Sequence, residues 1–131
     1  MVRKMKIINL VLVMLLGVSF VGCAGSEAVT YEQITQEKAK KIMDTEKGYI
    51  IIDARTQEEY DEGHIEGAIL IPEYEIASRA ENELKDKNQL ILVYCRTGRR
   101  SKIASEKLVK LGYKNVKEFG GITTWQYGVV K

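Results

Sequence analysis

The chain has 131 residues, in which 20 basic residues nearly balance 18 acidic ones to give a net charge of +2. This length holds a single domain, and a near-neutral chain lacks the strong positive charge that is typical of nucleic-acid-binding proteins. One histidine and two cysteines are too few side chains for the usual metal-ligand clusters, so no metal is expected.

Residues 1–22 have the pattern of a secretory signal peptide. Three basic residues precede an apolar run over residues 7–22, which ends in small residues and is shorter than the roughly 20 residues that span a bilayer comfortably. Residues 20–23 resemble the lipobox of bacterial lipoproteins, although Phe20 stands where leucine is usual. The resemblance implies that Cys23 is lipidated and becomes the first mature residue.

We therefore expect three parts: a signal peptide over residues 1–22, a tether over 23–30 and one domain over 31–131. The protein would be exported to the extracytoplasmic face of a bacterial membrane and held there by lipid; an uncleaved membrane anchor is the alternative. Removing the signal peptide leaves 17 basic against 18 acidic residues, a net charge of −1, which disfavours nucleic acid as a partner.

Strand and helix patterns alternate along the expected domain. Thr56 and Glu59 have the spacing of a capping box, and glycines at 63 and 112 provide helix ends. In chain order the patterns predict a helix over residues 35–43, a strand over 49–52, a helix over 56–63, a strand over 68–71, a helix over 75–84, a strand over 90–94, a helix over 101–111, a strand over 116–119 and a short helix over 121–127. Because the strands are nearly all apolar, we expect an α/β fold whose mainly parallel sheet of about five strands carries helices on both faces.

Cys95 follows the strand predicted over residues 90–94 and precedes a segment with one glycine and three arginines, residues 96–100. A strand that passes through a glycine turn into a helix leaves its first turn residue at the helix N-terminus, where unpaired amides favour negative charge. A thiol there should ionise readily and receive an anion. Since Cys23 is assigned to the lipid, Cys95 has no intramolecular disulfide partner; the alternative is a buried structural cysteine.

The order and spacing of several short motifs resemble the single-domain rhodanese family. The motifs are Asp53, Ala54 and Arg55; Glu59 and Tyr60; residues 63–68; Ile71 and Pro72; the loop of residues 95–101; and Gly120, Gly121 and Trp125. The resemblance covers about residues 31–131 and implies a domain that carries a sulfane sulfur as a persulfide on Cys95, without a cofactor. A thiolate would attack the outer sulfur of a small anion such as thiosulfate, and cyanide, a small thiol or a thiol protein would accept the sulfur.

The loop is expected to bind the persulfide and the donor. Its members after Cys95 are Arg96, Thr97, Gly98, Arg99, Arg100 and Ser101. Their backbone amides would form a nest for the anionic sulfur, and a guanidinium suits the donor's sulfonate. Arg100 and Arg96 are the candidates for donor binding, whereas the other possibility is that one or two of the arginines point to solvent.

Three further polar residues are assigned supporting roles. Asp53 and Arg55 are expected to pair with one another and satisfy loop backbone groups rather than act as an acid–base pair. By resemblance, His64 belongs to a structural turn; the alternative is a catalytic base. Tyr60 and Trp125 are expected in the core.

Two other functions remain open for the Cys95 loop. Cysteine phosphatases and arsenate reductases also bind a tetrahedral anion in a loop of this kind. In the phosphatase signature five residues separate the cysteine from the essential arginine, whereas four separate Cys95 from Arg100. The shorter loop favours sulfur transfer. The second alternative is a lipid-tethered module that senses redox state or binds sulfur without catalysis. The chain is expected to act as a monomer.

Overall fold

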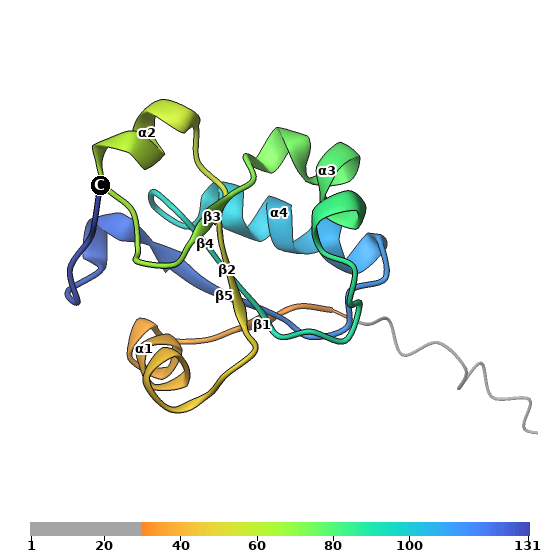
Figure 1. The fold of residues 1–131 in the computed structure, drawn as a ribbon, viewed down its shortest axis with the longest axis horizontal. Coiled ribbons are helices and arrows are strands. Elements are labelled where there is room, and N and C mark those ends of the chain that lie inside the picture. Colours follow the sequence, from red (N-terminus) through yellow and green to blue (C-terminus); the bar gives the residue numbers. More distant parts are fainter. Residues whose placement is uncertain (1–29) are drawn as a thin grey trace, which may run out of the picture.

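The computed structural model describes residues 30–131, so the predicted signal peptide, its cleavage site and Cys23 lie outside the described residues. In chain order the elements are β1 (Glu32–Gln33), α1 (Gln36–Thr45), β2 (Ile50–Asp53), α2 (Gln57–Glu62), β3 (Ile69–Leu70), the 3-10 helix η1 (Glu73–Glu75), α3 (Ile76–Glu83), β4 (Ile91–Cys95), α4 (Arg99–Lys110), β5 (Val116–Gly121) and the 3-10 helix η2 (Ile122–Thr124) (Figure 1). In this part of the chain, no helix is long and apolar enough to cross a membrane.

The five strands form one parallel sheet in the order β1-β5-β4-β2-β3. All five residues of the central strand β4 are buried, as expected for a parallel strand covered on both faces. Because the strands run in the same direction, their carboxyl ends meet at one edge, where Asp53 ends β2 and Cys95 ends β4. The predicted α/β class and the parallel sheet of about five strands are confirmed.

Helices cover both faces of the sheet, as predicted (Figure 1). Along β4, Ile91, Val93 and Cys95 belong to a buried cluster shared with α3 and α4, whereas Leu92 and Tyr94 belong to a cluster shared with α1. Successive side chains of a strand point to opposite faces of the sheet, so β4 contributes alternate residues to each cluster. The Cys95 side chain therefore lies on the face that α4 covers.

Eight of the nine predicted elements agree with the observed ones to within two residues at each end. The predicted helix over 121–127 is wrong: η2 ends at Thr124, and Trp125 is extended, with φ −73° and ψ 122°. Its indole Nε1 donates to the carbonyl of Gly128, and its ring packs on Phe119 in the core cluster below α1. This local hydrogen bond and the packing on Phe119 hold Trp125 in the extended conformation.

Strand β1 was not predicted because both of its residues are exposed and polar. It forms because Glu32 and Gln33 pair with Lys117 and Glu118 of β5, at the edge of the sheet. Tertiary pairing rather than local pattern determines this strand.

Candidate active site

Cys95 is the last residue of β4 and is buried at the carboxyl edge of the sheet. The backbone amide of Gly98 donates a hydrogen bond to Cys95 Sγ over 3.0 Å. Gly98 has φ +112°, a left-handed conformation that side-chain-bearing residues rarely adopt. Glycine at this position therefore lets the chain reverse directly over the sulfur and enter α4.

Helix α4 begins at Arg99, two residues earlier than predicted, and has no side-chain cap. The amides of Arg99 and Arg100 find no hydrogen-bond acceptor among residues 30–131. Unpaired amides at the start of a 12-residue helix carry the positive end of its dipole, which favours an anion. This part of the loop can therefore hold negative charge next to the buried sulfur.

Arg100 is held by Glu59, the third residue of α2. Its Nη1 and Nη2 donate to the two carboxylate oxygens of Glu59 over 2.6 and 2.9 Å. These hydrogen bonds lower the pKa of Glu59 to about 2, and the carboxylate in turn raises the pKa of Arg100. Glu59 also completes a capping box with Thr56, so α2 positions the carboxylate that orients Arg100.

The other two arginines of the loop are exposed, as is Thr97. The backbone of Arg96 is nevertheless fixed, because its carbonyl accepts hydrogen bonds from the amide and the hydroxyl of Thr123 in η2. A Cβ on Gly121 would lie 2.1 Å from the same carbonyl oxygen. Gly121 therefore allows β5 to support the Cys95 loop at a distance that no side chain would permit.

Ser101, the last residue of the loop and the third of α4, is fully buried. Its Oγ is 3.3 Å from Cys95 Sγ and donates to Glu118 Oε1 over 2.7 Å. Glu118 is buried as well, and its Oε1 also accepts from the amide of Gly120 over 2.8 Å. Glu118 was not predicted as a site residue, because residues 116–119 include two charged side chains, Lys117 and Glu118, and the pattern does not indicate which of them is buried.

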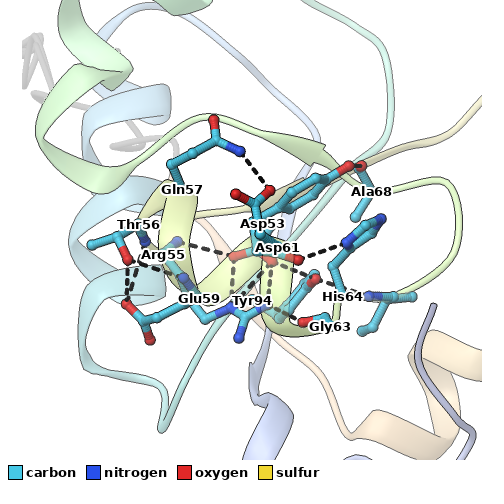
Figure 2. A network of polar contacts seen from close by, with 12 residues as sticks. Asp53, Arg55, Thr56, Gln57, Glu59, Asp61, Gly63, His64, Ala68 and Tyr94 are labelled. Atoms are coloured by element: carbon cyan, nitrogen blue, oxygen red, sulfur yellow. Dashed lines mark hydrogen bonds and ion pairs between the residues drawn. The ribbon is translucent and has the colours of Figure 1, made fainter. Parts of the chain in front are cut away.

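Asp53 and Arg55 form a buried pair behind the loop (Figure 2). Arg55 Nε and Nη2 donate to the carboxylate, and Nη2 also donates to the carbonyl of Gly63. Tyr94 donates its hydroxyl to Asp53 Oδ2 over 2.7 Å and accepts from the amide of Ile65. Burial alone would lower the pKa of Arg55, but the hydrogen bonds and charge of Asp53 outweigh it and raise this pKa. The pair thus ties β2 and β4 to the segment that follows α2.

Figure 2 also shows His64 in this network, beside Gly63 and Tyr94. Its ring stacks on Tyr60 with the centroids 3.6 Å apart, and Nδ1 lies 2.9 Å from the carbonyl oxygen of Tyr60. Its backbone pairs with Val130. These contacts give His64 a place in a turn that joins α2 to the C-terminal segment.

Trp125 lies on the other face of the sheet from the Cys95 side chain, against the cluster that α1 covers. A cavity of about 400 Å³ lies on that face, lined by Trp125, Tyr127 and Val129 among others, and it includes no residue of the Cys95 loop. Residues 30–131 contain no group of three His, Cys, Asp or Glu side chains arranged to hold a metal ion.

The fold and the site define an α/β domain with a cysteine at the end of its central parallel strand, below the N-terminus of a helix and beside three arginines. A family model for the rhodanese-like domain matches residues 35–127. The chain therefore belongs to the rhodanese-like domain family.

Two curated relatives and one solved structure show how close the similarity is. The chain is 42% identical over 71 residues to the thiosulfate sulfurtransferase PspE of Escherichia coli (strain K12), covering 54% of this chain and 68% of PspE. It is 32% identical over 97 residues to the thiosulfate sulfurtransferase GlpE of Coxiella burnetii, covering 73% of this chain and 88% of GlpE. A solved structure of a rhodanese with anions from E. coli matches with a TM-score of 0.60 and 38% identity, over 63% of this chain and 98% of that one.

Proposed function

We propose that this protein is a sulfurtransferase of the rhodanese type that carries a sulfane sulfur on Cys95. The observation that carries the proposal is the position of Cys95 Sγ, bonded to the Gly98 amide beneath the unpaired first-turn amides of α4. PspE and GlpE, of which this chain covers 68% and 88%, are thiosulfate sulfurtransferases. A loop that offers amides to an anionic sulfur suits that chemistry.

In the proposed first step, the Cys95 thiolate attacks the outer sulfur of thiosulfate. The sulfur–sulfur bond of the donor breaks, sulfite leaves with its electron pair, and Cys95 becomes a persulfide whose negative charge sits on the outer sulfur. In the second step, cyanide or a thiolate attacks that outer sulfur, and the Cys95 thiolate is released. Both steps balance without an oxidant or a cofactor.

The roles we propose for the three arginines of the loop differ from those expected from the sequence. Both terminal nitrogens of Arg100 are engaged by Glu59, so we propose that Arg100 mainly places a fixed positive charge beside the sulfur. Arg96 and Arg99 are exposed, and we assign them to the sulfonate of the incoming donor.

The direct test uses the full-length chain in detergent. With thiosulfate and cyanide it should form thiocyanate, and with thiosulfate alone Cys95 should gain a mass of about 32, one sulfur atom. The Cys95→Ser variant should lose both signals while keeping its circular dichroism spectrum. Absence of thiocyanate together with an unmodified Cys95 in the wild type would refute the function, and a fully active Cys95→Ser protein would place the chemistry elsewhere.

We also propose that the protein is exported and anchored through a lipid on Cys23, on the evidence of the residue 1–23 pattern. Cells labelled with a radioactive fatty acid should incorporate label into the wild type and not into a Cys23→Ala variant. Equal labelling of both chains, or of neither, would contradict the lipid anchor.

A further inference from the structure

A buried carboxylate lies one hydroxyl group away from Cys95. Glu118 is 3% exposed, Ser101 and Cys95 are 0% and 1% exposed, and the three side chains form a continuous chain of contacts. Cys95 Sγ lies 3.3 Å from Ser101 Oγ, which lies 2.7 Å from Glu118 Oε1. The two proposed steps of sulfur transfer do not involve Glu118.

Ser101 has a single hydroxyl hydrogen. Its nearest acceptor is Glu118 Oε1 at 2.7 Å, and the carbonyl of Gly98 at 3.0 Å and the Cys95 sulfur at 3.3 Å are also within reach. When Glu118 is ionised, the Ser101 hydroxyl donates to Glu118 Oε1. The serine oxygen can then accept a hydrogen bond from Cys95 if Cys95 is a neutral thiol. When Cys95 is ionised, the sulfur still accepts from the Gly98 amide; if the Ser101 hydroxyl also turns to the sulfur, Glu118 needs a proton to bond the serine oxygen. Ser101 can therefore bond Cys95 and Glu118 at the same time only when one of the two carries the proton.

The surrounding charges relieve this constraint only in part: Arg100 lies near enough to Cys95 to interact with its charge. Toward α4 and the loop, Arg100 is bound to Glu59, and Arg96 and Arg99 are exposed. Among residues 30–131, no lysine or arginine forms an ion pair with Glu118, whose bonded partners are the Ser101 hydroxyl and the Gly120 amide.

The charged groups on the neighbouring strands are already paired. Lys117, next along β5, is paired with Glu32 of β1, and Asp53 of β2 is paired with Arg55. Two negative charges this close in a buried site would therefore repel each other, and the positive charge nearest to them, on Arg100, is already paired with Glu59.

We propose that Cys95 and Glu118 share one proton through Ser101, and that Glu118 stores the thiol proton while Cys95 carries sulfur; this role rests on the proposed sulfur transfer. The thiol proton passes to Ser101 as the Ser101 proton passes to Glu118, leaving a thiolate and a neutral carboxyl group. Attack on thiosulfate then produces sulfite and an anionic persulfide, so the pair keeps a net charge of −1. After an acceptor thiolate takes the outer sulfur, the stored proton returns to Cys95. Glu118 acts through Ser101 and is thus a positioning residue.

The test measures ionisation of Cys95 without any sulfur donor. In a full-length Cys23→Ala background Cys95 is the remaining thiol, and the ultraviolet absorbance of its thiolate is followed against pH, with a Cys95→Ser protein as the tyrosine baseline. Glu118→Gln keeps the shape and the acceptor oxygen but cannot exchange a proton. Glu46→Gln, on an exposed residue after α1 at the opposite edge of the sheet, removes the same charge as a control.

A shared proton predicts that the thiolate absorbance of Glu118→Gln appears at a pH about one unit or more below that of the wild type. Glu46→Gln should match the wild type. In a Ser101→Ala background, adding Glu118→Gln should shift the midpoint by less, because the hydroxyl that couples the groups is gone, whereas Ser101→Thr should retain the coupling. Circular dichroism checks that each variant is folded.

Identical curves for the wild type and Glu118→Gln, or a shift to higher pH in the variant, would overturn the shared proton. Both results can be obtained whether or not thiocyanate forms. If the protein transfers no sulfur but Glu118→Gln shifts the titration, the proposed function is refuted and the shared proton is supported. If the protein transfers sulfur but the titration does not shift, the proposed function is supported and the shared proton is refuted.

Discussion

The ion pair between Glu59 and Arg100 should make the folding stability of this domain depend on pH in acid. Glu59→Gln removes the charge, and glutamine can still close the capping box with Thr56, so the change is confined to the ion pair. Lowering the pKa of Glu59 from 4.5 to about 2 corresponds to at most about 3.4 kcal/mol of stability at about 1.36 kcal/mol per pH unit. The Arg100 and Glu59 side chains are 27% and 20% exposed, so solvent screening reduces the expected loss to about 1–2 kcal/mol at neutral pH.

The sign of the pH dependence follows from the direction of this pKa. A carboxyl group whose pKa is lower in the folded state contributes its full stabilisation above its ordinary pKa of 4.5, and the contribution disappears as the pH falls toward about 2. The wild type and Glu59→Gln should therefore differ at neutral pH and converge in this window.

Urea unfolding followed by circular dichroism at a series of pH values measures the difference. Glu58→Gln, on the exposed neighbouring residue of α2, is the matched control and should change stability by only a few tenths of a kcal/mol, about the size of a helix-dipole effect. A gap between wild type and Glu59→Gln that stays constant from neutral pH to about 2, or that Glu58→Gln reproduces, would show that the ion pair does not stabilise the fold.

Three further substitutions test separate parts of the structure. Gly121→Ala places a Cβ 2.1 Å from the Arg96 carbonyl, so it should displace the Cys95 loop, abolish thiocyanate formation and lower stability by about 1–3 kcal/mol; an active variant would mean that the loop does not depend on this contact. Tyr94→Phe leaves Asp53 Oδ2 and the Ile65 amide without the hydroxyl between them and should cost about 1–3 kcal/mol in urea unfolding, and an unchanged midpoint would contradict the network. Thr35→Ala removes the hydroxyl that caps α1 and should cost about 1 kcal/mol while sulfur transfer stays at the wild-type rate, a loss of transfer being the unexpected result.

Local patterns in the sequence determined most of the secondary structure and the position of the reactive residue. The apolar run that ends at Cys95, the glycine at 98 and the amphipathic segment after it are close neighbours in the chain, so strand, turn and helix N-terminus could be predicted together. The capping box of Thr56 and Glu59 is likewise a spacing of three residues and is present in the structure.

Only the tertiary structure decided which distant side chains meet this loop. Glu59 reaches Arg100 across 41 residues of sequence, and Glu118 reaches Ser101 across 17, and neither contact has a local signal. The strand order brings α2 and β5 to opposite sides of the carboxyl end of β4, where both carboxylates face the loop. Sequence periodicity reports which face of an element is buried, but the partner on that face depends on how the whole sheet is assembled, so the charge balance around Cys95 is a property of the folded domain.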